Sequence, residues 1–239
     1  MIDWQQIGHK ALEKLRSPLR SLIHHSALNY HPVHFMTAEE QARYTPQMVL
    51  DDLIAGNERF SRGEYTVRDH SAAICSSYSS QYPKAFVLSC IDSRVPVEDI
   101  FDQGIGDIFV GRVAGNYATD DMVASMEYAC AVAGAKLILV LGHENCGAIK
   151  GAIQGVELGL LTGLLDKIKP AICNCEHDGT EHRPDNYDYT HNVAVWNIRH
   201  SLQQIRRSSP ILSQLEAEGR LMIRGAFYAV STGVIEFFD

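Results

Sequence analysis

Two continuous apolar runs decide the fold: residues 84–90 read KAFVLSC, and residues 135–143 read AKLILVLGH. Each run has the length of a strand and lacks the alternation of a half-exposed one, which is typical of parallel strands buried on both faces. Residues 107–113 (DIFVGRV) predict a further strand between them. The two long runs end on Cys90 and His143, and both residues can bind a metal.

Helical patterns alternate with these strands. An Ala-rich segment at residues 121–133 leads into the second long run, and residues 192–207 form another helical pattern. Residues 220–238 then predict a strand, a turn and a strand. This alternation favours an α/β fold with a mostly parallel central sheet flanked by helices, whose functional sites gather at the carboxyl ends of the strands.

The beginning of the chain has a different character. Residues 2–27 and 46–60 predict amphipathic helices separated by a stretch with His and Pro, and no strand is expected before residue 84. We therefore expect an N-terminal helical arm over residues 1–45, packed on the sheet or on a second subunit. Residues 46–239 are expected to form a single α/β domain, in which the polar segment 174–190 is a loop.

Composition limits the class of protein. With 239 residues, 46% of them hydrophobic, the chain can bury a substantial core. The net charge of −8 and the lack of a long Lys/Arg cluster argue against nucleic acid as a partner. The charged N-terminal sequence and the short apolar runs predict neither a signal peptide nor a membrane span, so we expect a cytoplasmic protein. Its six cysteines then indicate metal ligands or free thiols in preference to disulfides.

The residues that carry chemistry follow the two long strands. The first run leads into CIDSR (residues 90–94), and the second into HENCG (residues 143–147). Cys90, His143 and Cys146 together make a catalytic zinc set, because three ligands leave one position for water or substrate. An apolar helical pattern follows Cys146, so a helix dipole would favour its thiolate. Ordinary buried cysteines explain either motif alone, but not both motifs together.

Asp92 and Arg94 flank one residue just beyond the first strand. The guanidinium can hold the carboxylate by charge-assisted hydrogen bonds. A surface ion pair is the alternative, and it would contribute only about 0–1 kcal/mol to stability. Beside a zinc ligand, the Asp92 carboxylate could accept a hydrogen bond from zinc-bound water or move in to take the open position.

With these motifs the chain resembles the β-carbonic anhydrases. The resemblance extends from about residue 46 to the C-terminus and is specific, because CxDSR is combined with HxxC. It implies that Cys90, His143 and Cys146 bind one Zn²⁺ per chain, and that an Asp92–Arg94 dyad controls the fourth position. The matching segments are residues 90–96 (CIDSRVP), 101–104 (FDQG), 106–107 (GD), 112 (R), 114–116 (AGN), 141–143 (LGH) and 146–147 (CG).

The resemblance also implies a substrate pocket and an activity. Gln81, Phe109 and Tyr128 match residues that line the pocket in this family, and Gly147 matches a glycine whose backbone lies against it. Core packing is the alternative for Phe109 and Tyr128. The implied reaction is the reversible hydration of carbon dioxide to bicarbonate and a proton by zinc-bound hydroxide. Because family members draw the Gln, Phe and Tyr partly from a neighbouring chain, we expect a homodimer or a dimer of dimers.

The sequence departs from the family at three places, one of which is Val113, where the family often has Asn after the Arg. Val87 stands where one subset has the Trp of a regulatory bicarbonate site, which makes that site doubtful here although Arg112 is present. Glu144 replaces a common small residue beside His143.

Two other functions remain open at the level of sequence. One is a carbon disulfide or carbonyl sulfide hydrolase on the same scaffold, because zinc hydroxide can attack those carbons too. The other is a non-enzymatic zinc or redox module, in which Cys173, Cys175, His177 and His182 form a second site. CxC spacing is cramped for tetrahedral zinc, so a solvated loop is the better interpretation of that segment. No nucleotide cofactor is expected, because the glycines of residues 104–111 lack the required spacing and context.

Overall fold

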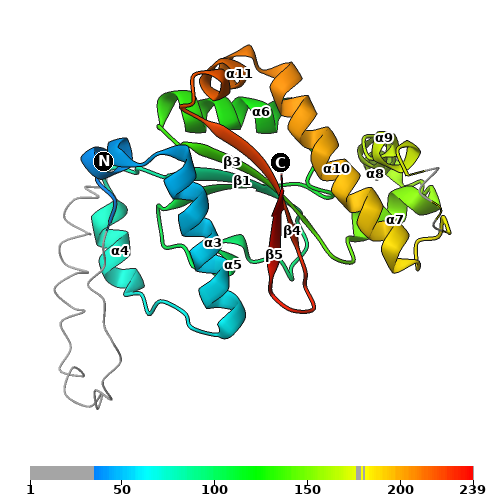
Figure 1. The fold of residues 1–239 in the computed structure, drawn as a ribbon, viewed down its shortest axis with the longest axis horizontal. Helices are drawn as coiled ribbons and strands as arrows, with labels where there is room; N and C mark the ends of the chain where they lie inside the picture. The colour runs from blue at the N-terminus through cyan, green and yellow to red at the C-terminus, as the bar shows by residue number, and fades with distance from the viewer. Residues whose placement is uncertain (1–34, 176–178, 180, 239) are drawn as a thin grey trace, which may run out of the picture.

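The computed structural model describes residues 35–175, 179 and 181–238, so the predicted helix at residues 2–27 lies outside the described residues. Within them a five-stranded sheet forms the centre, in the order β2-β1-β3-β4-β5 (Figure 1). The strand pairs β1–β2, β1–β3 and β3–β4 are parallel, and β5 runs antiparallel to β4. The predicted α/β class is confirmed. The strands are β1 (Ala85–Ser89), β2 (Ile108–Arg112), β3 (Leu137–His143), β4 (Met222–Tyr228) and β5 (Ile235–Phe238).

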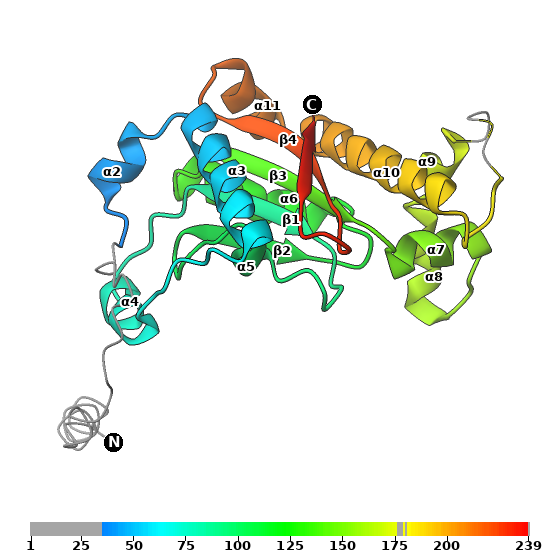
Figure 2. The same ribbon diagram turned by 60° about the horizontal axis from the view of Figure 1, so that its bottom comes forward.

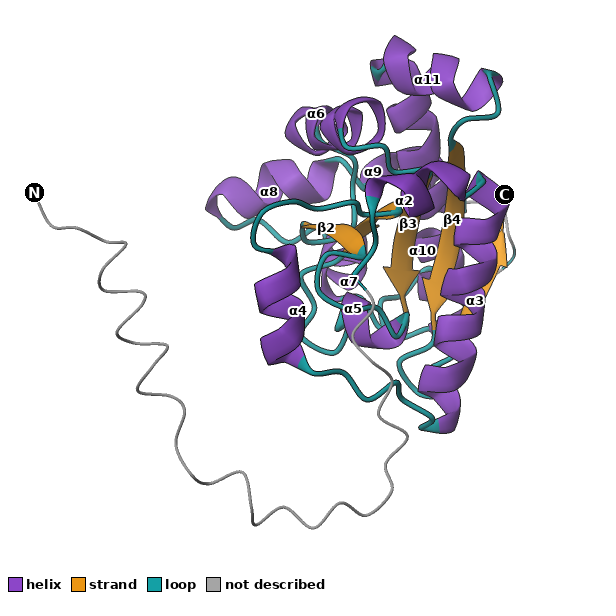
Figure 3. Ribbon diagram, turned by 90° about the vertical axis from the view of Figure 1, so that its left-hand side faces the viewer, coloured by secondary structure: helices purple, strands orange, loops and turns teal. Residues whose placement is uncertain are grey.

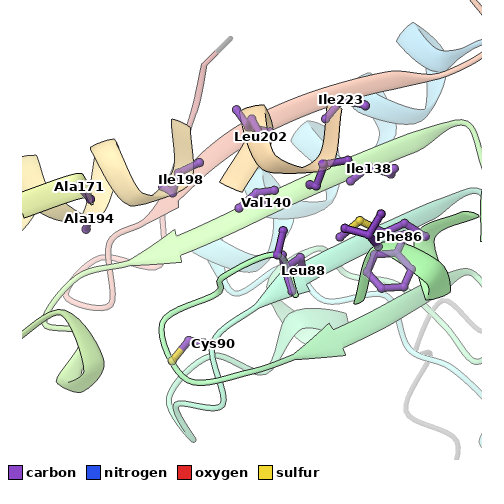
Figure 4. Close-up of a cluster of buried hydrophobic side chains, with 14 of the residues drawn as sticks. Phe86, Leu88, Cys90, Ile138, Val140, Ala171, Ala194, Ile198, Leu202 and Ile223 are labelled. Atoms are coloured by element: carbon purple, nitrogen blue, oxygen red, sulfur yellow. The ribbon is translucent and has the colours of Figure 1, made fainter. Parts of the chain in front are cut away.

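Alternate side chains of the central strands enter two different cores, one on each face of the sheet. Phe86 and Leu88 of β1 join one core, in a row that leads to Cys90 (Figure 4). Ala85 and Val87 join the other core. Because both faces are covered, β1 and β3 carry no polar side chain before their last residues, Ser89 and His143. The first face carries α6 (Asp120–Glu127), α7 (Gly147–Gln154), α10 (Tyr187–Ser208) and α11 (Pro210–Ala217), and the second carries α3 (Pro46–Arg62) and α5 (Val97–Ile100) (Figure 2).

The N-terminal part that is described contains two helices beyond the prediction. The helix expected at residues 46–60 is α3, and it packs on its own sheet. Before it lies α2 (Ala38–Arg43), which begins with a capping box between Thr37 and Glu40. That T-x-x-E pattern is a local start signal that could have been recognised in the sequence. After α3 comes α4 (His70–Ser77), whose apolar residues stand in one consecutive run, 72–75, and so give little helical periodicity.

Two further boundaries differ from the sequence prediction. The helix expected at residues 121–133 is α6 followed by one π-helical turn, η2 (Tyr128–Val132). The loop expected over residues 174–190 ends earlier, because α10 begins at Tyr187 with Asn186 as its N-cap. Tyr189 is buried in this first turn and gives the polar segment an anchor. Figure 3 shows how the helices surround the sheet, including the two short ones between α7 and α10, α8 (Gly159–Asp166) and α9 (Lys169–Cys173).

No single helix among the described residues is both long and apolar enough to cross a membrane. Only α7 and α8 taken together pass by length and composition, and the two helices are bent by 91° relative to each other.

Candidate active site

Cys90, His143 and Cys146 come together at the carboxyl end of the sheet. Cys90 directly follows β1, His143 ends the neighbouring strand β3, and Cys146 is the N-cap residue of α7. All three residues are buried, and their ligand atoms lie within 4.8 Å of one another. Parallel neighbouring strands end at the same edge, which is why residues distant in sequence meet here. The structure thus brings together the three ligands expected from the sequence.

The donor atoms of this cluster fit a zinc ion. The Cys90 and Cys146 sulfurs are 4.0 Å apart, and tetrahedral zinc with bonds of about 2.3 Å places two sulfurs about 3.8 Å apart. His143 Nδ1 donates to the Glu144 carbonyl at 2.9 Å, an arrangement that leaves Nε2 as the ligand nitrogen. Nε2 is buried and has no hydrogen-bond partner within the described part of the chain. Three donors of this kind leave a fourth tetrahedral position.

The Cys90 and Cys146 sulfurs share a hydrogen bond that shifts their pKa values in opposite directions. A hydrogen bond from Cys146 lowers the pKa of Cys90 to about 4, in spite of burial, and His143 and the Gly115 N–H act in the same direction. The same hydrogen bond, together with burial, raises the pKa of Cys146 well above its usual value. This arrangement favours a thiolate at Cys90 and therefore a cation beside the two sulfurs. A bound divalent metal would release the second proton as well.

Asp92 lies beside this cluster and is held by Arg94. Arg94 Nε and Nη2 donate to the two carboxylate oxygens at 3.0 and 2.8 Å, and the Arg94 backbone N–H adds a bond at 2.9 Å. The guanidinium lowers the pKa of Asp92 to about 2. The carboxylate is therefore ionised at neutral pH. Its Oδ2 atom lies 3.9 Å from His143 Nε2, next to the ligand set.

Arg112 is a neighbour of the site that the sequence analysis did not place there. It lies at the end of β2 and donates from Nε to the Cys90 carbonyl at 2.9 Å and from Nη2 to the Asp92 carbonyl at 2.6 Å. It therefore fixes the backbone that carries both a ligand and the carboxylate. Its position within the RVAGN segment was the available signal, but only the fold shows which carbonyls it binds.

A cavity of about 400 Å³ opens beside Cys90 and Asp92. Gly147 forms part of its lining, and a Cβ there would meet nothing within 4 Å, so open space lies beside its backbone. Much of the remaining lining comes from α7, α8 and the turn between them. Its apolar side chains are Ala148, Val156, Leu161 and Leu165, and α7 adds the polar Lys150 and Gln154.

The structure does not bring Gln81, Phe109 and Tyr128 to this cavity within the described chain. Phe109 pairs with Phe86 near the start of β1, whereas Cys90 follows the end of that strand. Gln81 precedes β1 and is exposed. Tyr128 is 52% exposed, and its ring lies 6.3 Å from that of Phe109. The three residues therefore lie toward the amino ends of β1 and β2, and the Cys–His–Cys cluster lies at the carboxyl ends.

Comparison with known proteins gives the family. The family model described as carbonic anhydrase matches residues 85–235. Carbonic anhydrase 2 of Mycobacterium tuberculosis is 34% identical over 187 residues, which cover 74% of this chain and 86% of that protein. The chain belongs to the β-carbonic anhydrase family. Carbonic anhydrases are lyases, so this member is an enzyme of that class.

Two further comparisons agree with this assignment. A carbonic anhydrase of Pseudomonas aeruginosa is 33% identical over 203 residues, covering 80% of this chain and 88% of the relative. The solved structure of a Coccomyxa β-carbonic anhydrase in complex with acetazolamide superimposes with a TM-score of 0.62 at 25% identity, covering 70% of this chain and 77% of that one. The fold and the family therefore rest on both sequence and structure.

The second metal site considered for Cys173 and Cys175 finds no support among the described residues. Cys173 is exposed and Cys175 is buried. The only group of Cys, His, Asp and Glu that could hold a metal in the described part of this β-carbonic anhydrase is Cys90 with His143 and Cys146. His177, the third member of that hypothesis, lies outside the described residues.

Proposed function

We propose that this enzyme is a zinc-dependent carbonic anhydrase that reversibly hydrates carbon dioxide to bicarbonate and a proton. The proposal rests on one observation: Cys90, His143 and Cys146 form a buried three-donor cluster beside an Asp92 carboxylate held by Arg94. One zinc ion per chain fits this set. When bound, zinc acts as a Lewis acid and makes hydroxide available at neutral pH.

The residues around the metal position have separate tasks in this proposal. The Asp92 carboxylate accepts a hydrogen bond from the water to be activated and orients that water. Arg94 holds both oxygens of Asp92, so that the carboxylate does not occupy the fourth position itself. The apolar side chains of α7, α8 and the turn between them suit carbon dioxide, which has no net charge and offers weak acceptors only.

The pocket is completed by a second copy of the chain in this proposal. Gln81, Phe109 and Tyr128 lie toward the opposite ends of the strands from the zinc cluster, so one chain cannot supply both halves of a site. β2 is an edge strand, and Tyr128 beside it is half exposed. A homodimer in which each chain lends these three residues to its partner's metal explains both features, and two such dimers associate in the larger form, a dimer of dimers.

A stopped-flow assay of carbon dioxide hydration on zinc-loaded protein tests the proposal. We expect hydration that stops after zinc is removed by a chelator and returns when zinc is added back. Carbon disulfide and carbonyl sulfide, assayed in parallel, test hydrolase activity on the same scaffold, for which the comparisons offer no support. Rapid hydrolysis of either compound without carbon dioxide hydration would replace the proposed substrate. Zinc binding without turnover of any of the three compounds, carbon dioxide, carbon disulfide or carbonyl sulfide, would indicate a non-enzymatic module.

A further inference from the structure

A backbone N–H points at one of the proposed ligand sulfurs. Gly115 N donates to Cys90 Sγ, with the two atoms 3.4 Å apart. Gly115 and the next residue, Asn116, both have left-handed backbones, with φ of 77° and 44°. Gly and Asn are the residue types that adopt this region most readily, so the sequence suits the turn.

Two polar side chains of α10 hold this turn. Asn197 Nδ2 donates to the Gly115 carbonyl at 2.7 Å, and Ser201 Oγ donates to the Asn116 carbonyl at 3.2 Å. Asn197 and Ser201 are one helical turn apart, and both are fully buried with 0% exposure. Buried polar side chains are costly unless they are used, and here they bind two successive carbonyls of the same turn.

The position of α10 is in turn fixed by close packing. Ile198, next to Asn197, sits over two glycines of the sheet: a Cβ at Gly142 would lie 2.6 Å from Ile198 Cδ1, and one at Gly225 would lie 2.9 Å from its Cγ2. Figure 4 shows Ile198 on α10 above the sheet, in the same core as Cys90. Gly142 directly precedes His143. Helix α10 therefore packs against β3, which carries His143. The same helix also holds the Gly115 turn, which donates to Cys90.

We propose that Asn197, supported by Ser201, is a positioning residue for Cys90. It holds the Gly115 turn so that the Gly115 N–H stays on the sulfur, and thereby sets how strongly that sulfur binds the metal. The hydrogen bond fixes the orientation of the sulfur that would bind the metal, and the loss of outer groups of this kind lowers metal affinity. This inference rests on the proposed zinc site.

The test compares Asn197→Leu, which is similar in size but cannot donate, with wild-type protein in two measurements. The first is the rate of zinc release to a chelator, and the second is the thiolate-to-cobalt charge-transfer band of the full-length protein loaded with Co²⁺. We expect zinc release to be about 10- to 100-fold faster in Asn197→Leu, with a shifted band. Ser201→Ala should change both in the same direction by less.

A matched control separates positioning from general loss of stability. Asn57 is also a buried amide, and it donates to the carbonyls of Ile100 and Gly233 on the opposite face of the sheet. Asn57→Ala should lower the free energy of unfolding while leaving the cobalt band and the zinc release rate at wild-type values. Equal acceleration of zinc release in Asn57→Ala and Asn197→Leu would overturn the inference.

The outcomes also distinguish this inference from the proposed function. A wild-type protein without a thiolate-to-cobalt band would refute the Cys–His–Cys metal site itself. A normal wild-type band, unchanged in Asn197→Leu and Ser201→Ala and with unchanged zinc release, would refute only the role of Asn197. If Asn197→Leu does not fold, the zinc release rate and cobalt band of Ser201→Ala decide the question alone, because this variant removes only the hydroxyl that binds the same turn.

Discussion

Arg94 and Asp92 form a two-point ion pair that faces the ligand set: Nε and Nη2 lie 3.0 and 2.8 Å from the two carboxylate oxygens. Arg94 Nη2 also donates to the Asn145 carbonyl at 3.3 Å, which ties the loop after β1 to the loop after β3. The carboxylate is therefore held between both ligand-bearing loops, only 3.9 Å from His143 Nε2.

Removing the restraint should lower turnover without loss of metal. In Arg94→Ala, the freed Asp92 carboxylate can take the fourth metal position, so we expect kcat/KM for carbon dioxide to fall by about 10- to 100-fold while zinc content stays at the wild-type level. Arg183→Ala is the matched control, because Arg183 binds Asp185 through the same two-point geometry on the exposed loop before α10. Its turnover should be unchanged. An Arg94→Ala enzyme with wild-type kcat/KM would remove Arg94 from the proposed mechanism.

Metal content should depend on Cys90 but not on Cys173. We expect elemental analysis to find one zinc per chain in the wild-type protein and almost none in Cys90→Ser, because a hydroxyl is a poor zinc ligand. Cys173 is exposed and lies outside the cluster, so Cys173→Ser should keep the full zinc content. X-ray absorption should show two sulfurs and one nitrogen from the protein. Two zinc ions per chain in the wild type would revive the second site.

Two inactive variants should complement each other when they are mixed. Cys90→Ser lacks a ligand, and Gln81→Ala lacks a pocket residue that this chain cannot bring to its own cluster. In a mixed dimer one of the two sites would combine both intact halves, so activity should partly return after the chains are exchanged. Mixing Cys90→Ser with His143→Ala should restore nothing, because both changes damage the same half. A fully active monomer in sedimentation at assay concentration would contradict the shared site.

The ion cluster at Asp102 should make stability depend on acidic pH. Asp102 is buried, which favours its neutral form, but hydrogen bonds from Thr66, Arg59 and Arg68 lower its pKa overall. Arg59 Nε and Arg68 Nη1 lie 2.6 and 2.5 Å from its carboxylate oxygens. The folded pKa is thus below the unfolded value of about 3.9, so the stabilisation is complete above that pH and is lost as pH falls through the folded pKa.

Urea unfolding of wild type and Asp102→Asn across pH 3 to 7 measures this effect. At pH 7 the wild type should be the more stable protein, and the difference in unfolding free energy should shrink below about pH 4. Taking the difference at each pH removes the contribution of zinc loss in acid, which both proteins share. A difference that stays constant down to pH 3 would show that Asp102 does not titrate in this range.

The sequence by itself determined the strands and the candidate ligand set. β1 and β3 are buried on both faces, so all their positions except the polar last residue are free of polar side chains, and the signal is local and continuous. Cys90 and His143 follow directly at the ends of these strands, and parallel neighbours bring those ends together. The short helices α2 and α4 were missed because caps, and not periodicity, define them.

Only the tertiary structure decided how the site is supported and where its parts lie. Arg112 reaches the carbonyls of Cys90 and Asp92, and Asn197 reaches Gly115, across contacts between distant segments. Such hydrogen bonds depend on the packing of α10 and the register of β2, which leave no local pattern in the chain. The same register separates Phe109 from Cys90. Phe109 pairs with Phe86 near the amino end of β1, whereas Cys90 follows the carboxyl end of that strand.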